Sequence, residues 1–364
     1  MGFTCGIIGL PNVGKSTIFN ALATARVPAS SYPFCTIDPN KGMVAVPDKR
    51  LLKIAEIVHP PKVSPTHIEF LDIAGLVKGA SHGEGLGNQF LGHIRTVDAL
   101  VHVVRCFKQQ EVSHLYGSLD PKRDMEIVNT ELILADLETL EKRMGKAAKL
   151  LRVGDKKAEA EISVYQKVKA WLEKVNTART LQLEEDEIHI VKDLSLLTIK
   201  PVVYVANVNE EELMTKSYST TVEQIAKQEK AGFVVICGDM ESEIALLESE
   251  EEKEEFMKDL RLEESGLQKL VKVGYGLLNL ITFYTTVGPE LRAWTVLKGT
   301  RAPQAAGKIH SDMERGFIKA EVVSYSDFIK AGSLATAREE GHLRLEGKDY
   351  CIQDEDIVHF RFSQ

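Results

Sequence analysis

The stretch GLPNVGKST, residues 9–17, constrains the fold more than any other part of the chain. It matches the pattern G-x-x-x-x-G-K-[ST], follows the apolar run TCGIIGL and precedes a helix start, IFNALA. Gly9 and Gly14 permit backbone conformations that aim several N–H groups at one anion. In such a loop Lys15 contacts the β- and γ-phosphates of a nucleotide, and Ser16 offers its hydroxyl to Mg²⁺. The other nucleotide-binding candidates in the loop are Asn12, Val13 and Thr17.

The loop lies in a region where short apolar runs alternate with helical stretches. THIEFLDIAG, ALVHVVRCF, PVVYVAN and GFVVICG are rich in Ile, Val and Phe, as buried strands are. Strands that alternate with helices form mostly parallel sheets with helices on both faces. We therefore predict an α/β fold of the P-loop NTPase type, a Ras-like nucleotide-binding domain made by residues 1–122 and 197–280.

Residues 123–196 have a different pattern. NTELILADLETLEKRMGKAAKLLR and AEAEISVYQKVKAWLEKV have apolar residues at helical spacing, many charges and one Gly-Asp break at 154–155. The pattern predicts two long antiparallel helices, a coiled-coil hairpin inserted into the α/β domain. In residues 281–364, short strands such as RAWTVLKGT and DIVHFRF alternate with turns, which predicts a small separate domain with much β structure.

Composition excludes several classes of protein. The 364 residues, 44% of them hydrophobic, are enough for two or three packed domains. No apolar run approaches the roughly 20 residues of a membrane helix, and the N-terminus lacks the basic start of a secretory signal. The five Cys have no C-x-x-C pair, which favours reduced thiols over disulfides or a zinc site. The net charge of −8 argues against a general nucleic-acid coat. We expect a cytoplasmic protein without a membrane partner and without DNA sequence specificity.

A second motif, EFLDIAG, supplies candidates for binding the metal and the γ-phosphate. Asp72 ends an apolar strand, where a carboxylate can hold Mg²⁺ through water, and the N–H of Gly75 can turn toward a γ-phosphate. Between the two motifs, YPFCTIDPN places Thr36 in a loop as a candidate second Mg²⁺ ligand. The Gly-rich run GLVKGASHGEGLGN, residues 75–88, fits a switch segment that changes order with the nucleotide state.

Leu76 occupies the position where Ras-like enzymes place a Gln that orients the attacking water. Leucine cannot polarise water, so another group must hold it. Two histidines lie near the predicted switches, His82 in the Gly-rich run and His114 in KQQEVSHLYG. The alternative for each histidine is an ordinary surface or packed residue.

The strand PVVYVAN leads into the sequence Asn-Val-Asn-Glu at 207–210, where many GTPases have Asn-Lys-x-Asp. Guanine presents two donors to that Asp, N1–H and the 2-amino group. Adenine presents a donor at N6 but an acceptor at N1, which a carboxylate would repel. The amide of Asn207 can serve N7 and N6, and backbone groups of Val208 can complete the recognition of adenine. The missing Asp therefore favours ATP over GTP. The alternative is that Glu210 extends to guanine and the protein is an unselective GTPase.

Together these motifs resemble the YchF or Obg-like ATPase subfamily of Obg-related, TRAFAC-class P-loop proteins. The resemblance covers the whole chain and includes GLPNVGKST, YPFCTIDPN, VVRCF and NVNE. It also includes a C-terminal part, RAWTV, GFIKAEV and DIVHFRF, that is similar to a TGS domain, a β-grasp module. The resemblance implies a fold of three parts, a preference for ATP over GTP, and a slow ATPase that acts as a switch. The implied cofactor is Mg²⁺, with K⁺ as a further candidate cation.

The resemblance also implies roles for particular residues. Asn207 would recognise adenine and Phe107 would pack near the base. His114 would be the catalytic candidate beside Lys15, while His82 lies where relatives vary and is interpreted as a surface residue. The stretch CGDME, residues 237–241, is expected to supply only backbone contacts.

Similar proteins are associated with ribosomes, so the implied partner is the ribosome or ribosomal RNA. The sequence adds a basic tip to the predicted hairpin, which RNA phosphate would favour with strong salt dependence. A solvated helical face is the alternative. The basic residues of this tip are Lys142, Arg143, Lys146, Lys149, Arg152, Lys156 and Lys157.

Three hypotheses for the function follow. The first is an ATP-hydrolysing switch that binds ribosomes, the second an Obg-type GTPase, and the third a binding adaptor in which the nucleotide is structural. Cys35, in the predicted switch loop, is a candidate for redox control, with a small packed residue as the alternative.

Overall fold

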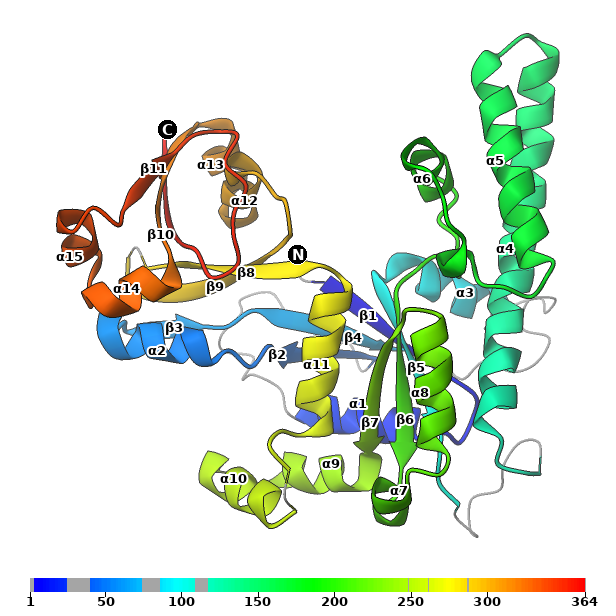
Figure 1. Cartoon of the computed structure of the whole chain (residues 1–364), viewed down its shortest axis with the longest axis horizontal. Coiled ribbons are helices and arrows are strands. Elements are labelled where there is room, and N and C mark those ends of the chain that lie inside the picture. The colour runs from blue at the N-terminus through cyan, green and yellow to red at the C-terminus, as the bar shows by residue number, and fades with distance from the viewer. Residues whose placement is uncertain are drawn as a thin grey trace.

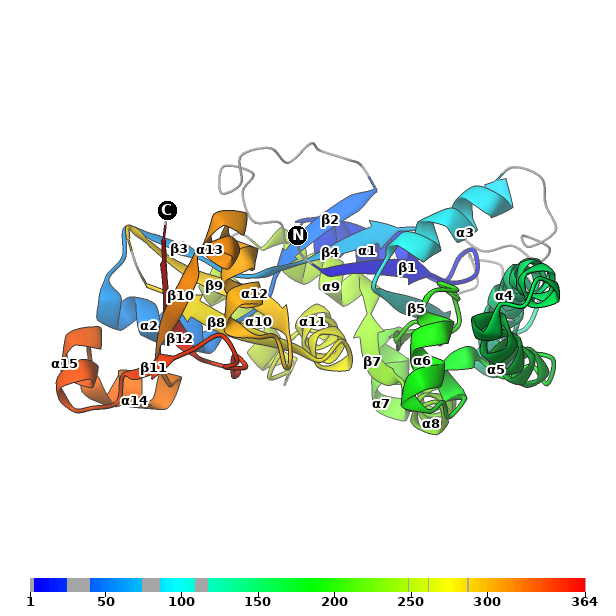
Figure 2. The same ribbon diagram turned by 90° about the horizontal axis from the view of Figure 1, so that it is seen from above.

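The computed structural model describes residues 3–24, 40–73, 86–108, 117–247, 249–260, 262–286 and 288–363. Within these ranges the strands form two six-stranded sheets, and a long helical hairpin stands beside the first of them (Figure 1). The hairpin and the second sheet lie on opposite sides of the first sheet (Figures 1 and 2). None of the helices in the described ranges combines the length and the apolar character that a membrane crossing requires.

The first sheet has the strand order β2-β4-β1-β5-β6-β7, in which β2 pairs antiparallel with β4 and the other neighbours pair parallel. Its strands are β1 (Phe3–Ile8), β2 (Lys41–Ala45), β4 (His67–Asp72), β5 (Ala99–Arg105), β6 (Val202–Val208) and β7 (Gly232–Cys237). Strands β5 and β6 are buried along their whole length, as their continuous apolar runs predict. The predicted α/β fold is confirmed. Because these parallel strands point the same way, the carboxyl ends of β1, β4, β5, β6 and β7 lie at one edge of the sheet.

Helices on this sheet bury their apolar sides in one continuous core. They are α1 (Lys15–Thr24), α3 (Leu86–Thr96), the first part of α4 (Pro121–Arg152), α8 (Ser219–Gln228), α9 (Gly238–Leu246) and α11 (Gly266–Leu277). The short helix α7 (Glu210–Thr215) follows β6. The acidic stretch after β7 forms two helices, because α9 ends before Leu247 and Ser249 caps a new helix, α10 (Glu250–Asp259).

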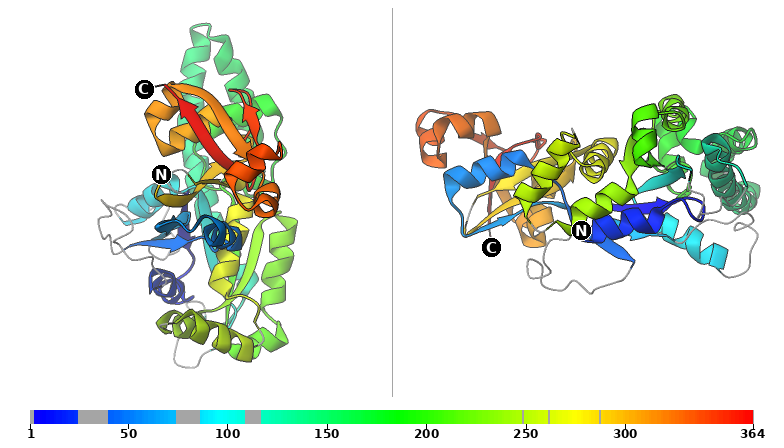
Figure 3. Two further views of the ribbon diagram at one scale, coloured as in Figure 1. Left: turned by 90° about the vertical axis from the view of Figure 1, so that its left-hand side faces the viewer. Right: turned by 90° about the horizontal axis from the view of Figure 1, so that it is seen from below.

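The hairpin consists of α4 and α5 (Lys156–Leu172), which run side by side as a narrow projection (Figure 3). The chain reverses at Gly154, whose φ of 89° suits glycine, and Asp155 caps α5 by accepting the N–H of Lys157 at 2.9 Å. Leu140, Val168 and neighbouring apolar side chains form a separate small core between the helices. The chain then returns to the first sheet through η2 (Ala178–Thr180) and α6 (Glu185–Lys192).

A buried carboxylate fastens the hairpin to the segment that leads into β6. Asp136 on α4 is 0% exposed, and it accepts the backbone N–H groups of Leu197 at 2.7 Å and Thr198 at 2.8 Å. It also accepts the hydroxyl of Thr198 at 2.6 Å. Three short bonds to one carboxylate fix where the hairpin leaves the domain.

The second sheet has the order β11-β10-β12-β8-β9-β3. Its strands are β3 (Lys62–Ser64), β8 (Leu280–Thr285), β9 (Glu290–Leu297), β10 (Phe317–Val323), β11 (Arg344–Glu346) and β12 (Ile357–Phe362). The helices of this part are α12 (Ala302–Ile309), α13 (Ser311–Arg315), α14 (Tyr325–Ala331) and α15 (Leu334–Glu339). It has two apolar cores of its own.

One strand and one helix of the second part come from the N-terminal third of the chain. Strand β3 pairs parallel with β9, and helix α2 (Lys49–Val58) packs Leu51 and Ile54 into the core beside Tyr284 and Phe328. Arg50 on α2 also bonds Glu355 at 2.7 Å. This arrangement is not evident from the sequence, and it joins the two sheets through α2 and β3 as well as through α11.

Replacing Asp136 with Ala should destabilise the protein by about 3 kcal/mol, because two backbone N–H groups and a hydroxyl would be left buried without an acceptor. Thermal unfolding followed by circular dichroism would measure the change. Glu138→Ala, which removes an exposed carboxylate from the same helix, is the matched control and should shift the midpoint little. Equal midpoints for the two variants would contradict this account of how the hairpin is fastened.

Candidate nucleotide-binding site

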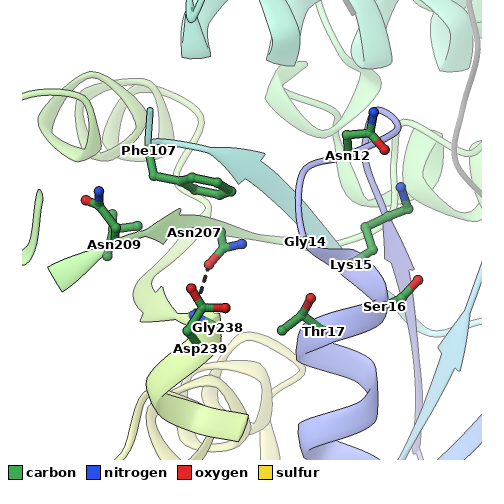
Figure 4. A pocket seen from close by; sticks show the side chains of 11 residues that line it. Asn12, Gly14, Lys15, Ser16, Thr17, Phe107, Asn207, Asn209, Gly238 and Asp239 are labelled. Carbon is green, nitrogen blue, oxygen red and sulfur yellow. Dashed lines mark hydrogen bonds between the residues drawn. The ribbon is translucent and has the colours of Figure 1, made fainter. Parts of the chain in front are cut away.

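A cavity of about 300 Å³ opens at the carboxyl edge of the first sheet (Figure 4). The loop after β1 and the first turn of α1 form one end of it, and residues that end or follow β5, β6 and β7 form the other. The residues that line it are Asn12, Gly14, Lys15, Ser16, Thr17, Phe107, Asn207, Val208, Asn209, Gly238 and Asp239.

Most of the candidates from the sequence therefore meet around one cavity. Val13 is buried, and its carbonyl accepts a hydrogen bond from the side chain of Asn207. Asp72 ends β4, and its charge acts on Lys15. Several candidates lie outside the described residues, and their roles stay predictions. These are Cys35, Thr36, Gly75, Leu76, His82 and His114.

The glycines of the loop are required by the space around them. Gly14 has a φ of 90°, and a Cβ there would lie 2.1 Å from Nδ2 of Asn207. A Cβ at Gly9 would lie 2.4 Å from the carbonyl oxygen of Val103. The loop can lie this close to β5 and β6 only because neither position has a side chain.

Lys15 is buried, and its ammonium group donates to the carbonyl of Leu10 across the loop at 2.7 Å. Burial lowers the pKa of Lys15 from 10.5 to about 8, while the nearby Asp72 carboxylate raises it. The loop thus holds a poorly solvated cation at its centre. An anion that replaces the Leu10 carbonyl would stabilise the charge.

Among the residues that the structure describes, none forms a hydrogen bond with the buried Oδ1 atom of Asp72. Burial raises the pKa of this carboxyl, and Lys15 lowers it. A carboxylate with an unpaired buried oxygen suits a bound cation or a water held by one. No group of three or more His, Cys, Asp or Glu in the described ranges is arranged to hold a metal by itself. A Mg²⁺ ion bound mainly through nucleotide phosphates needs only one or two protein oxygens, so Ser16 and Asp72 fit that ion.

Asn207 connects the two ends of the cavity. Its Nδ2 donates to the carbonyl of Val13 at 2.9 Å, and its Oδ1 accepts the N–H of Gly238 at 3.1 Å. The side chain is almost completely buried. These bonds use one of its two N–H donors and one of its two acceptor positions. Asn207 therefore positions the phosphate loop and the β7–α9 turn, and keeps capacity for a ligand.

Arg105 is a residue that the sequence analysis missed. Its guanidinium lies over the ring of Phe107, 4.6 Å from the centroid, and its Nε donates to the carbonyl of Phe107 at 3.2 Å. It also donates to the carbonyl of Asn12 at 3.5 Å. The last residue of β5 thus orients both the aromatic ring and the loop. The sequence signal was only that a charged residue ends an otherwise apolar strand.

Glu210, the candidate substitute for the guanine-binding Asp, is exposed and lies outside the cavity lining. It is the first residue of α7, and the side chain of Asn209 caps this helix by accepting the N–H of Glu212 at 3.0 Å. Asp239 and Gly238 line the cavity instead, although the sequence analysis expected only backbone contacts there.

Comparisons with known proteins agree with this geometry. A family model described as "50S ribosome-binding GTPase" matches residues 4–134, and a C-terminal model named for the YchF GTPases, described as "Protein of unknown function (DUF933)", matches residues 280–363. A relative from Haemophilus ducreyi, named "Ribosome-binding ATPase YchF", is 52% identical over 363 residues, which is 100% of both chains. The chain belongs to the YchF family. A YchF relative of the same name from Bacillus subtilis is also 52% identical over 100% of both chains.

Solved structures place the fold in the same family. The YchF GTPase of Schizosaccharomyces pombe is 36% identical, with a TM-score of 0.89 over 99% of this chain and 98% of that one. A GTP binding protein from Pyrococcus horikoshii OT3 has the same fold at 20% identity, with a TM-score of 0.61 over 100% of both chains. The resemblance found in the motifs is therefore confirmed.

Nucleotide affinity should fall as the pH rises through the pKa of Lys15, about 8, because the cationic form binds phosphate. Between about pH 7.5 and 9.5 we expect roughly a tenfold loss, a range in which phosphate, with a pKa near 6, is already ionised. Titration with a fluorescent ATP analogue would measure it. Lys15→Arg keeps its charge over this range and should show no such fall, whatever its absolute affinity.

The stability of the nucleotide-free protein should change in the opposite direction. The folded pKa of Lys15 lies below its ordinary value of 10.5, so the unfolded chain binds more protons between these values. The contribution of Lys15 to the free energy of unfolding therefore rises with pH in this window. For the affinity measurement, a nucleotide affinity that stays constant between about pH 7.5 and 9.5 would contradict the assignment of Lys15 as the buried cation of the loop.

Proposed function

We propose that this chain is an ATP-hydrolysing molecular switch that binds ribosomes and modulates translation or the stress response. Two kinds of observation support the proposal. The full-length relatives are named for ribosome binding and ATPase activity, and the cavity combines a phosphate-binding loop with a partly apolar end that fits a purine. A ribosomal partner would place the protein in the cytoplasm.

The preference for ATP is carried by the position of Glu210. In GTPases with Asn-Lys-x-Asp, a carboxylate accepts N1–H and the 2-amino group of guanine; here Glu210 is exposed outside the cavity lining. Asn207 has one N–H and one acceptor position left, which suits N7 and the 6-amino group of adenine. Phe107, fixed by Arg105, offers its ring to the base.

The residues of the loop divide the work on the phosphates. Lys15 exchanges the Leu10 carbonyl for a phosphate oxygen, and backbone N–H groups of the loop hold the neighbouring oxygens. Ser16, Thr36 and Asp72 would hold Mg²⁺, which when bound offsets the negative charge of the phosphates. K⁺ is a further candidate for the same purpose.

Another residue must position the hydrolytic water, because Leu76 replaces the usual Gln. We assign this role to His114, on sequence grounds, and assign the γ-phosphate contact to Gly75. A His114→Ala protein that binds ATP normally but hydrolyses it at the wild-type rate would remove His114 from the mechanism.

The tip of the hairpin supports a ribosomal contact. Its basic side chains are exposed, and apolar side chains stand among them, with Val153 80% and Leu150 48% exposed. Cations attract RNA phosphate, and exposed apolar groups favour contact with another macromolecule. A projecting element of this kind can reach into a crevice of a large particle.

ATP should bind at least tenfold more tightly than GTP, a difference of about 1.4 kcal/mol. The measurement is competition of each unlabelled nucleotide against a fluorescent ATP analogue in the presence of Mg²⁺. Equal or tighter binding of GTP would favour the Obg-type GTPase instead, an alternative supported by the description of the N-terminal family model.

Ribosome binding should weaken as salt rises, and Lys156→Ala combined with Lys157→Ala should flatten that dependence. We expect the slope of log affinity against log salt to fall by roughly one unit for each phosphate that the tip no longer neutralises. Cosedimentation with ribosomes at several salt concentrations would measure it. The control is Lys298→Ala with Lys348→Ala, two exposed lysines of the second sheet region. Identical slopes for both double variants would argue against the tip.

A further inference from the structure

The carboxylate of Asp239 has no role in the function proposed so far. Asp239 lies in the first turn of α9, directly after β7, and lines the cavity together with Phe107 and Asn207. Figure 4 shows it beside Asn207 and Gly238, on the side of the cavity away from Lys15 and Ser16. It therefore belongs to the end where the base would lie, not to the phosphate end.

The position of Asp239 relative to the base follows from Asn207. The N–H of Gly238, the preceding residue, donates to Oδ1 of Asn207 at 3.1 Å, and a Cβ at Gly238 would lie only 3.3 Å from that same oxygen. The β7–α9 turn is thus packed directly against the Asn207 amide. If this amide faces N7 and the 6-position of a purine, as the proposed function has it, Asp239 adjoins the 6-substituent.

The nucleobases differ at this position in a way that a carboxylate detects. Adenine has a 6-amino group, which donates hydrogen bonds, and guanine has a 6-oxo group, which only accepts them. An ionised carboxylate accepts hydrogen bonds and donates none. It would attract the 6-amino group and repel the 6-oxo group.

We propose that Asp239 is a specificity-determining residue that accepts a hydrogen bond from the 6-amino group of adenine and disfavours 6-oxo purines. The inference rests on the proposed function, because it takes Asn207 to face the 6-position edge of the base. The missing guanine-binding Asp removes a contact that favours GTP, and Asp239 adds a contact that favours ATP.

A helix N-terminus also favours a carboxylate in its first turn, so the charge alone could explain an Asp here. Glu241, the other acidic residue of that turn, is buried. It accepts the N–H of Gly266, the first residue of α11, at 2.6 Å, and so satisfies a donor at the start of that helix. Stabilisation of a helix does not depend on which substituent the base carries. An experiment that varies the 6-substituent therefore separates the two roles.

The experiment measures the affinities of ATP and of purine riboside triphosphate, which has hydrogen in place of the 6-amino group. The proteins are the wild type, Asp239→Ala, Asp239→Asn and Glu243→Ala, which removes an exposed carboxylate from the same helix outside the cavity lining. Competition against one fluorescent ATP analogue keeps all values comparable.

In the wild type and in Glu243→Ala, removal of the 6-amino group should weaken binding about tenfold, or about 1.4 kcal/mol. In Asp239→Ala the same removal should weaken binding clearly less than in the wild type, since one of the two acceptors of the 6-amino group is already gone and only Asn207 remains. Asp239→Asn keeps the shape of the side chain and can donate to a 6-oxo group, so it should bind GTP more tightly than the wild type does.

Equal sensitivity to the 6-amino group in all four proteins would overturn the inference. So would weaker GTP binding with unchanged ATP binding in Asp239→Ala, because the carboxylate would then contact N1–H and the 2-amino group of guanine. A wild-type protein that binds ATP and GTP equally would instead overturn the proposed ATP preference, and the inference with it.

Discussion

The amide of Asn207 holds together the loops on which the site depends. It bonds the carbonyl of Val13 in the phosphate loop and the N–H of Gly238 in the turn after β7, and it is only 4% exposed. In so dry an environment, breaking either bond would leave a buried polar group without a partner. This amide also leaves no room for a side chain at Gly14, because a Cβ there would lie 2.1 Å from Nδ2 of Asn207. The two ends of the cavity are therefore positioned by one side chain rather than separately.

Strands β5 and β6, which end at the cavity, also contact the helix α4 and the segment that returns from the hairpin. On β6, the hydroxyl of Tyr204 donates to Glu229 at 2.9 Å and accepts from Asn129 of α4 at 3.3 Å. His102 on β5 packs against Tyr204 at 5.3 Å between ring centroids, and burial lowers its pKa to about 3, so it stays neutral. Arg179, on the segment returning from the hairpin, pairs with Glu229 at 3.3 Å. Packed and hydrogen-bonded side chains thus connect β5 and β6 to α4 and to the segment that returns from the hairpin.

Local signals made much of this structure predictable. The phosphate loop, strands β5 and β6 and the Gly-Asp turn of the hairpin each follow from a few neighbouring residues. The features that could not be predicted depend on contacts between segments that are far apart in the sequence. Strand β3 has only three residues and is defined by its pairing with β9. Arg105 and Asp239 matter because of the loops that they face across the cavity, and those loops come from distant parts of the sequence. The acidic stretch 241–260 by itself predicts one continuous helix, because acidic residues lie on both sides of the break between α9 and α10. Thr36, Gly75 and His114 lie outside the described residues, so their roles rest on the motifs alone.

The most direct test is a crystal structure with a non-hydrolysable ATP analogue and Mg²⁺. The account predicts that Nζ of Lys15 leaves the Leu10 carbonyl for a phosphate oxygen, while Asn207 keeps both its bonds to Val13 and Gly238. The adenine should lie between the Phe107 and Asp239 sides of the cavity, with its N7 edge toward Asn207. An Asn207 amide that releases either partner to bind the base, or a base seated on Glu210, would contradict the claim that Asn207 preforms an adenine site.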